Sequence, residues 1–316
     1  MYNYNKNDLD KIAVGTDFIR DNLEKVFRLC DILRFLSENS LFSENLALKG
    51  GTAINLTIFD CPRLSVDIDL DFTSECSREE MLVIRENINQ NFLNYIFAQG
   101  YALSPNTKNP HSLDSWVLYF QNAGGNKDNM KVEINYSLRN HILPIIKKKV
   151  NADFLHFDCM VRTLSTLELF GSKIKALIER AAPRDLFDVY NMLEFSVVDP
   201  NDIDMLRKIV LFYLAVGGND KPSVNYDFGN IDNIKFAQIK SSLLPVLKKS
   251  ERFDFESAKT KVKNFLLKLM IPTENEKLFV ENFNQKKYQP ELLFDNADII
   301  KNIKTHPMAI WKIRNC

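Results

Sequence analysis

The sequence predicts an α+β protein in which a mixed sheet flanked by helices is followed by an all-helical C-terminal half. Two observations on periodicity predict this class: period-two alternation occurs in the first half, whereas helical spacing dominates from about residue 167 onward. A third is glycine, whose 10 occurrences among 316 residues are too few for a turn-dense all-β fold. We therefore expect two domains, 1–160 and 161–316, with a boundary near residue 160.

Composition excludes several classes of protein. Apolar residues make up 45% and charged residues 26%, as in ordinary globular chains, and equal counts of 41 basic and 41 acidic residues give zero net charge. The chain as a whole therefore does not attract nucleic acid, and any polyanion site must be a local patch. No apolar run reaches the length of about 18 residues typical of a membrane span, and no secretory signal is evident. Five scattered cysteines without metal-ligand spacing favour reduced thiols, no structural zinc and a cytoplasmic protein with no membrane partner.

The elements follow from periodicity, turn residues and helix breakers. In the first half we expect an amphipathic helix at 18–37, a short apolar stretch at 45–48, a helix at 53–59, a strand at 65–72, a capped helix at 78–99, and a hairpin of strands 115–121 and 131–137. In the second half we expect helices at 167–182, 184–195, 202–216, 235–249, 255–269, 273–284 and 291–303. Pro245 is expected to kink or split the fourth of these.

The strand at 65–72 is the first chemical signal, because apolar residues alternate with Asp67, Asp69 and Asp71. Carboxylates two residues apart on a strand share one face, with Cα atoms about 7 Å apart. Bringing two such charges to about 4 Å costs about 4 kcal/mol at an effective dielectric constant of about 20. Either this face is solvated and the carboxylates splay apart, or a divalent cation lies between them. Carboxylate oxygens combined with substrate phosphates select Mg²⁺ or Mn²⁺.

A glycine pair upstream of this strand strengthens the second alternative. Gly50 and Gly51 allow a backbone to approach a phosphate, and the N–H groups of the helix that follows favour an anion. Thr52 can donate a hydroxyl hydrogen bond to that anion, or it can simply cap the helix. With fourteen residues between Thr52 and Asp67, one element would hold a triphosphate and the next would hold the metal ions that bridge it.

These residues resemble a known family. A Gly-Gly-Thr followed by Asp-x-Asp is similar to the signature of polymerase-β-like nucleotidyltransferases, and the stretch 49–70 resembles the AbiEii/AbiGii-type toxins of bacterial abortive-infection toxin–antitoxin pairs. The resemblance runs from about residue 46 to residue 195. It implies a nucleotidyltransferase-like N-terminal domain that transfers a nucleoside monophosphate from an NTP to an acceptor hydroxyl with Mg²⁺ (or Mn²⁺). It also implies an RNA acceptor, such as a tRNA 3′ end, and a cognate antitoxin encoded nearby.

A third carboxylate is expected to complete the metal site formed by Asp67 and Asp69. In the strand 131–137, Glu133 lies on the polar face, where it could bind metal or act as general base for an attacking hydroxyl. The alternative is a surface ion pair with Lys131, which contributes about 0–1 kcal/mol. Asp71 competes as the third acid, but its position along the same strand suits the shared site less well.

A second group of charged residues lies on two adjacent predicted helices. Lys173 and Arg180 are seven residues apart and share a helix face, and Asp185 and Asp188 share a face of the next helix. The segment from 168 to 190 resembles the same toxins, although a serine precedes the lysine where the family has glutamate, and phenylalanine replaces a tyrosine. The resemblance implies that the helical domain contributes Lys173 to the nucleotide phosphates and Asp185 to orient that lysine or activate the acceptor.

Several alternatives stay open at this point. For Arg180, Arg184 and Asp188, ion pairing that merely docks the two helices is an equal alternative. Arg63 and Ser65 precede the acidic strand, where they could bind a nucleotide phosphate or lock the loop. The lysine run 147–149 could be a solvated surface or an RNA contact. The same site could also serve a small-molecule or protein acceptor, and a non-catalytic nucleotide-binding module is a third alternative.

Overall fold

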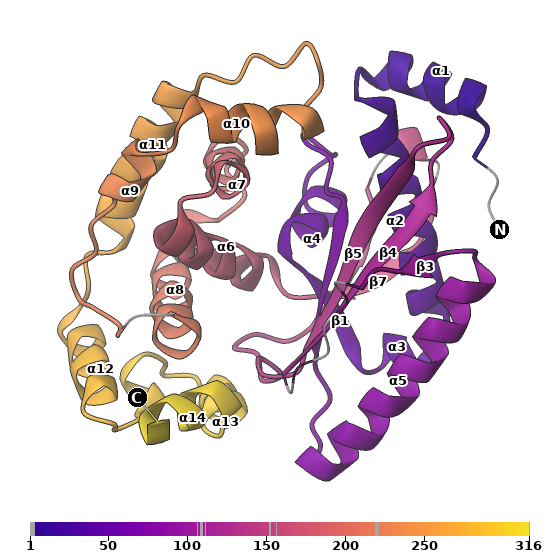
Figure 1. Ribbon diagram of the computed structural model, residues 1–316. Coiled ribbons are helices and arrows are strands. Elements are labelled where there is room, and N and C mark those ends of the chain that lie inside the picture. Colours follow the sequence, from indigo (N-terminus) through magenta and orange to yellow (C-terminus); the bar gives the residue numbers. More distant parts are fainter. Residues whose placement is uncertain are drawn as a thin grey trace. The chain divides into compact units, whose positions relative to one another are not determined.

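The computed structural model describes residues 4–105, 107, 110, 112–151, 153–155, 157–218 and 221–315. These residues form two compact units (Figure 1). The sheet unit draws on Met1–Arg139, Ile145–Thr163 and Pro245–Glu251, and the helical unit on Asn140–Pro144, Leu164–Leu244 and Arg252–Cys316. The chain therefore passes between the units several times, and a division into domains 1–160 and 161–316 stays a prediction.

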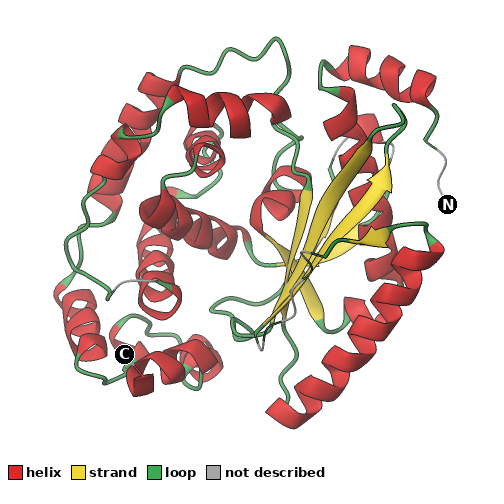
Figure 2. Ribbon diagram, in the orientation of Figure 1, coloured by secondary structure: helices red, strands yellow, loops and turns green. Residues whose placement is uncertain are grey.

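A seven-stranded mixed sheet forms the centre of the sheet unit (Figure 2). The strands are β1 (Leu46–Lys49), β2 (Asp67–Phe72), β3 (Ala102–Leu103), β4 (Leu113–Gln121), β5 (Lys127–Asn135), β6 (Ile146–Lys149) and β7 (Met160–Thr163). Their order is β3-β4-β5-β2-β1-β7-β6, with the pairs β2–β5 and β1–β7 parallel and the other four antiparallel. Together with the many helices, this sheet confirms the predicted α+β class.

Five helices accompany the sheet. They are α1 (Lys6–Thr16), α2 (Arg20–Glu38), α3 (Ser40–Ser43), α4 (Gly50–Thr57) and α5 (Arg78–Ala98). The predicted capping box of α5 is present, since the Ser77 hydroxyl accepts from the Glu80 amide and the Glu80 carboxylate accepts from the Ser77 amide. Helices α2 and α5 cover one face of the sheet, and α4 lies on the opposite side from α5 (Figure 1).

Alternation along β2 separates an apolar face from a polar face of the sheet. Ile68, Leu70 and Phe72 are buried, and Leu70 lines a cavity together with Leu33 and Leu36 of α2. On the apolar face, Phe92 of α5 packs on Trp116 of β4 with ring centroids 4.7 Å apart. The aspartates that alternate with the apolar residues consequently project from the other face, where α4 lies.

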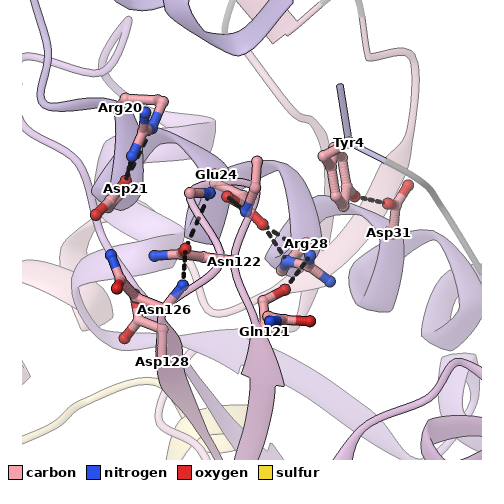
Figure 3. Close-up of polar contacts among 12 residues, drawn as sticks. Tyr4, Arg20, Asp21, Glu24, Arg28, Asp31, Gln121, Asn122, Asn126 and Asp128 are labelled. Atoms are coloured by element: carbon pink, nitrogen blue, oxygen red, sulfur yellow. Dashed lines mark hydrogen bonds and ion pairs between the residues drawn. The ribbon is translucent and has the colours of Figure 1, made fainter. Parts of the chain in front are cut away.

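The β4–β5 hairpin has a shorter connection than the sequence predicts. The prediction starts the second strand at residue 131, whereas β5 begins at Lys127. The Asn122 side-chain oxygen accepts from the Gly124 and Asn126 amides, at 3.0 and 2.9 Å, and Gly125 adopts φ +85°. These contacts close a tight turn that propensity alone does not reveal (Figure 3).

Helix α2 anchors this turn to the rest of the sheet unit. The buried Glu24 carboxylate accepts two hydrogen bonds from Arg28, at 2.9 and 2.7 Å, and a third from the Ala123 amide at 2.8 Å. Figure 3 shows Glu24 and Arg28 beside Gln121 and Asn122. A buried, fully hydrogen-bonded charge of this kind fixes the position of the turn on α2.

The helical unit is built around α6, which packs against both α7 and α8. Its helices are α6 (Thr166–Arg180), α7 (Pro183–Glu194), α8 (Ile203–Gly217), α9 (Gly229–Asp232), α10 (Phe236–Ser242), α11 (Phe255–Leu269), α12 (Glu274–Asn284), α13 (Ala297–Ile303) and α14 (Pro307–Asn315). A Cβ at Gly171 of α6 would lie 2.3 Å from the Ile209 side chain of α8, so only glycine permits this close approach.

Two predictions about helices need correction. The helix predicted at 235–249 ends at Ser242, because Pro245 sits in a 3₁₀ turn and the chain then enters the sheet unit. Only the end of the helix predicted at 291–303 is helical, from Ala297. The sequence predicted no element for the lysine run 147–149, which lies in strand β6, paired with β7. Lys147 and Lys149 are exposed there, and contact with RNA stays a prediction.

Two further findings concern membrane-spanning helices and cysteines. No helix in the described part of the chain has the length and apolar character needed to cross a bilayer. Four cysteines are free thiols, namely Cys30, Cys61, Cys76 and Cys159, and Cys316 lies outside the described residues.

Candidate active site

The glycine turn between β1 and α4 lies directly against the acidic strand. Strand β1 ends at Lys49, and Gly50 begins α4 with φ +70°, in the left-handed region that favours glycine. A Cβ on Gly50 would lie only 2.5 Å from Oδ2 of Asp69. The fold thus brings a predicted phosphate-binding residue and a predicted metal ligand together, with no room for a side chain between them.

Gly51 packs in the same way on the loop before β2. A Cβ there would lie 2.6 Å from a guanidinium nitrogen of Arg63 and 3.3 Å from Oγ of Ser65. Arg63 is only 2% exposed and donates to the Leu64 carbonyl at 3.0 Å. Both side chains therefore support the glycine turn, as the loop-locking alternative predicts, and their contact with nucleotide stays a prediction.

The segment around Val246 holds this loop from its other side. The Leu64 amide donates to the Val246 carbonyl at 2.8 Å, and Arg63 forms an isolated antiparallel bridge with Leu247. Residues distant in the sequence thus complete the loop that supports Gly51.

Thr52 links α4 to the start of β2. It lies inside the helix and is not the N-cap, since Lys49 occupies that position without a side-chain cap. The Thr52 hydroxyl donates to the Asp67 carbonyl and lies 2.9 Å from Ser65 Oγ. Thr52 therefore fixes the backbone at Asp67. The sequence predicted either helix capping or phosphate binding for this hydroxyl and did not reveal the contact with Asp67.

Glu133 lies beside Asp69. Strands β2 and β5 are parallel, and their register pairs Asp69 with Glu133 and Asp67 with Lys131. Side chains in register on neighbouring strands share a face, with the strands about 4.8 Å apart. Glu133 also pairs with Lys131 at 2.8 Å, which is the ion pair expected as the alternative, and its role as metal ligand or base stays a prediction.

The carboxylates suit a divalent metal in their chemistry. Asp67, Asp69 and Glu133 offer the hard oxygen donors that Mg²⁺ and Mn²⁺ prefer, on one face of the sheet. Among the residues that the structure describes, no group of three histidines, cysteines, aspartates or glutamates is arranged to hold a metal ion. The metal site therefore stays a prediction. For Glu133 to complete that site, its carboxylate would have to leave Lys131 and bind the metal ion.

The third aspartate of β2 has a different environment from the other two. The Asp71 side chain is 3% exposed and forms an ion pair with Lys49 at 2.5 Å. From the sequence, Asp71 is expected to be a less suitable metal ligand than Glu133, and no role is expected for Lys49. The sequence signal that could have indicated this ion pair is a lysine directly before Gly50 and Gly51, followed by a strand that carries three acidic residues.

The predicted residues of the helical unit form a cluster of their own. The Lys173 ammonium of α6 lies between two buried carboxylates of α7, 2.9 Å from Asp185 and 3.1 Å from Asp188. Arg180 donates to both oxygens of Asp185, at 2.7 and 3.1 Å. These contacts hold Lys173 in place and join α6 to α7, and the roles of Lys173 and Asp185 toward a nucleotide stay predictions. Arg184 instead donates to the Ser242 carbonyl at 2.6 Å.

Asp185 is held in its charged form. Burial raises the pKa of its carboxyl, but the Lys173 ammonium and Arg180 guanidinium lower it more, and the pKa falls to about 2. At neutral pH the Asp185 carboxyl is therefore ionised beside Lys173 and Arg180. Because Lys173 and Asp185 belong to the helical unit, and Asp67, Asp69 and Glu133 to the sheet unit, the predicted catalytic residues fall in two groups.

Glu168 is a buried charge that the sequence analysis left without a role. Its carboxylate accepts from the Ile142 and Leu143 amides, at 2.9 and 3.0 Å, and from the Tyr213 hydroxyl. Burial raises the pKa of Glu168, but hydrogen bonds and the neighbouring His141 lower it more. Glu168 thereby anchors the segment 140–144 within the helical unit.

Comparisons with known proteins identify the family of the chain. The family model described as "Nucleotidyl transferase AbiEii toxin, Type IV TA system" matches residues 34–283. Among solved structures, the chain resembles MenT4, a nucleotidyltransferase toxin from Mycobacterium tuberculosis H37Rv, with a TM-score of 0.57 and 13% identity over 98% of this chain and 99% of that one. This second likeness shows the fold alone. A search of curated proteins gave no match. The resemblance predicted from the sequence is confirmed, and the chain belongs to the AbiEii family of nucleotidyltransferase toxins of type IV toxin–antitoxin systems.

Proposed function

We propose that this nucleotidyltransferase toxin transfers a nucleoside monophosphate from an NTP to a hydroxyl of RNA, such as the 3′ end of a tRNA, with Mg²⁺ or Mn²⁺. The observation that carries the proposal is the position of Asp69, which lies against the backbone of Gly50 and beside Glu133. In this proposal the enzyme acts in the cytoplasm, in abortive-infection defence against viruses, and a cognate antitoxin restrains it.

The reaction makes one bond to phosphorus and breaks another. The acceptor hydroxyl oxygen bonds to the α-phosphorus, the bond from that phosphorus to the bridging oxygen breaks, and pyrophosphate leaves with the bonding electrons. The hydroxyl proton passes to a base. Because no covalent bond to the protein is needed, binding geometry and neutralisation of charge provide the rate enhancement.

The sheet unit would bind the triphosphate and the divalent ions. Backbone N–H groups of Gly50 and Gly51, at the start of α4, would bind the β- and γ-phosphates. Asp67, Asp69 and Glu133 would hold the ions, which supply neutralisation of phosphate charge and activation of the acceptor. Glu133 is also the candidate base, since its partly exposed carboxylate can reach solvent.

The helical unit would contribute a cation. We propose that Lys173 neutralises phosphate charge and that Asp185 and Asp188 hold and orient its ammonium. The distances of 2.9 and 3.1 Å to the two carboxylates support this role. Arg180 would assist by holding Asp185 from its second oxygen.

The identity of the acceptor is the least constrained part of the proposal. A single-stranded RNA end presents an accessible hydroxyl and a phosphate backbone, and Lys147 and Lys149 are exposed on β6. A small molecule or a protein is the second candidate acceptor. A direct test distinguishes the two kinds of acceptor. The protein is incubated with each labelled NTP, first with total RNA and then with pools of protein and of small molecules, and the labelled product is identified.

The test has a matched control. Label should enter RNA of tRNA size, be removed by RNase and be absent with Asp69→Asn. Label in protein or small molecules, with the same dependence on Asp69, would replace RNA as the acceptor. Label that persists in Asp69→Asn would remove the proposed site.

A further inference from the structure

The C-terminal end of the chain is a basic segment in a protein without net charge. Residues 299–315 contain four basic side chains, Lys301, Lys304, Lys312 and Arg314, and no aspartate or glutamate. Helices α13 and α14, drawn in yellow in Figure 1, carry them together with the loop that joins these helices. Because the whole chain has zero net charge, a polyanion must bind at a local patch of this kind.

Three of the four cations are exposed and lack an acidic partner. Lys301, Lys304 and Arg314 form no ion pair with any residue that the structure describes. Lys312 differs, since its ammonium donates to the Gly218 carbonyl at the end of α8. This contact fixes α14 on α8, against which the helix also packs. The other three cations are therefore held on an anchored surface and are accessible to phosphates.

Trp311 lies among these cations. It is 52% exposed, and no aromatic ring of the described residues packs on its indole. The second tryptophan of the chain, Trp116, is 1% exposed and packs on Phe92. Arg314 follows Trp311 by three residues on α14, so the two side chains are neighbours on the helix surface. An open aromatic face is thus presented beside a guanidinium.

The lysines lie near this face along the chain. Lys301 is in the last turn of α13, and Lys304 is the C-cap of that helix. Three chain steps and one helical turn separate Lys304 from Trp311, so their Cα atoms lie within about 17 Å of each other. A single strand of about 4–16 nucleotides, the usual length bound at one site, is long enough to contact all of these residues.

A protein interface is the competing use of an exposed tryptophan. Protein interfaces are enriched in aromatic residues but depleted in lysine. Single-stranded nucleic acid requires both, because bases stack on aromatic faces and cations neutralise phosphates. The combination of one tryptophan with Lys301, Lys304 and Arg314 therefore favours RNA over a protein partner.

We propose that Lys301, Lys304, Trp311 and Arg314 form a binding site for single-stranded RNA, which we call the C-terminal patch. A base stacks on the indole of Trp311, and the three cations pair with the flanking phosphates. The patch binds RNA and takes no part in the bond-making step. The inference rests on the proposed function, because it takes RNA to be the acceptor.

Tryptophan fluorescence tests the stacking, since Trp311 is exposed and Trp116 is buried. An oligoadenylate of about 12 nucleotides, added to the full-length protein without NTP or divalent ion, should quench the emission. Trp311→Leu should weaken binding of this RNA about tenfold, as measured by the anisotropy of a dye on the oligomer. Trp311→Phe keeps an aromatic face and should bind within about threefold of the wild type.

The matched control for the aromatic side chain is Phe97→Ala. Phe97 is 51% exposed on α5, and the sequence has no lysine or arginine within ten positions on either side. This variant removes an equally exposed ring without basic neighbours in the sequence. It should bind the oligomer like the wild type.

The salt dependence of binding tests the cations. Changing Lys301, Lys304 and Arg314 together to glutamine should lower the slope of log affinity against log salt concentration by about two, because each phosphate contact on a single strand contributes about 0.7. Lys277→Gln is the control, since Lys277 of α12 pairs with Glu274 at 2.7 Å. Its slope should match that of the wild type.

Each outcome bears on one proposal. Wild-type affinity in folded Trp311→Leu, equal weakening by leucine and phenylalanine, or an unchanged slope in the triple variant overturns the C-terminal patch as an RNA site and favours a protein partner there. In the transfer assay, Trp311→Leu should raise the KM for RNA and leave kcat unchanged. Failure of the proposed function is distinct, because label would then enter protein or small molecules while the fluorescence titration still reports on RNA binding.

Discussion

Glu133 of β5 lies in register with Asp69 of β2, on neighbouring parallel strands. The two residues come from separate strands, one after the glycine turn and one in the β4–β5 hairpin. Parallel pairing puts their side chains on one face, and Gly50 adjoins the same aspartate. This relationship underlies the predictions about activity.

Asp67→Asn and Asp69→Asn should each lower the rate of nucleotidyl transfer by about a hundredfold or more, because each removes a charge that the divalent ions need. Melting temperatures should change little, since both side chains are partly exposed. Pyrophosphate release and thermal unfolding measure the two effects. Turnover close to that of the wild type in either folded variant would end the assignment of that residue.

Glu133→Gln should lower transfer about tenfold or more, whether Glu133 binds metal or accepts the acceptor proton. The two roles differ in the pH profile of kcat, which a lost base flattens on its acidic side. Lys131→Met is the control, because the Lys131 side chain is 43% exposed and its ion pair contributes about 0–1 kcal/mol. Equal losses in both variants would point to the ion pair and not to Glu133.

Gly50→Ala should abolish most activity at a modest cost in stability. The left-handed conformation costs alanine about 1 kcal/mol, and its methyl group would displace the Asp69 carboxylate, 2.5 Å away. Gly125→Ala shares the positive φ but meets nothing within 4 Å. Urea unfolding should show similar losses of stability in the two variants, while pyrophosphate release should fall only in Gly50→Ala.

Lys173→Ala should raise the KM for NTP or lower kcat, and should also destabilise the protein. It leaves Asp185 and Asp188 buried with one cation fewer, a change that costs about 3–5 kcal/mol. Arg207→Met separates the two effects, because Arg207 forms a buried pair with Glu276 at 3.0 Å elsewhere in the same unit. If both variants lose stability and neither alters KM or kcat, Lys173 is structural.

His306 should make stability depend on pH. Burial, aided by the nearby His141, lowers the pKa of His306 to about 3, and its Nδ1 accepts from the Ala309 amide at 3.4 Å. Below its unfolded pKa of about 6.5, the unfolded chain binds a proton that the folded chain does not, so the free energy of unfolding falls as pH falls. The loss should be about 2 kcal/mol between about pH 7 and about pH 5.

His306→Asn keeps an acceptor at the start of α14 but cannot titrate in this range. Urea unfolding at the two pH values should show that the difference shrinks in this variant. An equally steep dependence in His306→Asn would assign the effect to other groups.

Much of the site was predictable because its chemistry is local. The Gly-Gly-Thr turn, the alternating aspartates of β2 and the polar face of β5 follow from spacing and period. The capping box of Ser77 and Glu80 follows from four consecutive positions. The resemblance to the AbiEii family rests on the same short stretches.

Relations between distant strands were not predictable from one sequence. The register that pairs Asp69 with Glu133 depends on which strands are neighbours, and the partner of Lys49 depends on which carboxylate is buried. Arg63 likewise has the charge of a phosphate ligand, yet tertiary packing buries it under Gly51. Short strands such as β6 and β7 lack enough residues to show a period.

The seven residues Pro245–Glu251 give the sheet unit a dependence on the rest of the chain. They supply the Val246 carbonyl that holds Leu64, and they follow α6, α7 and α8 in the chain, so they are synthesised after these helices. A nascent chain that contains every strand of the sheet still lacks the Val246 carbonyl, which accepts from the Leu64 amide in the loop that supports Gly51. The glycine turn is therefore complete only after the chain has been made as far as residue 251, well beyond the last strand of the sheet.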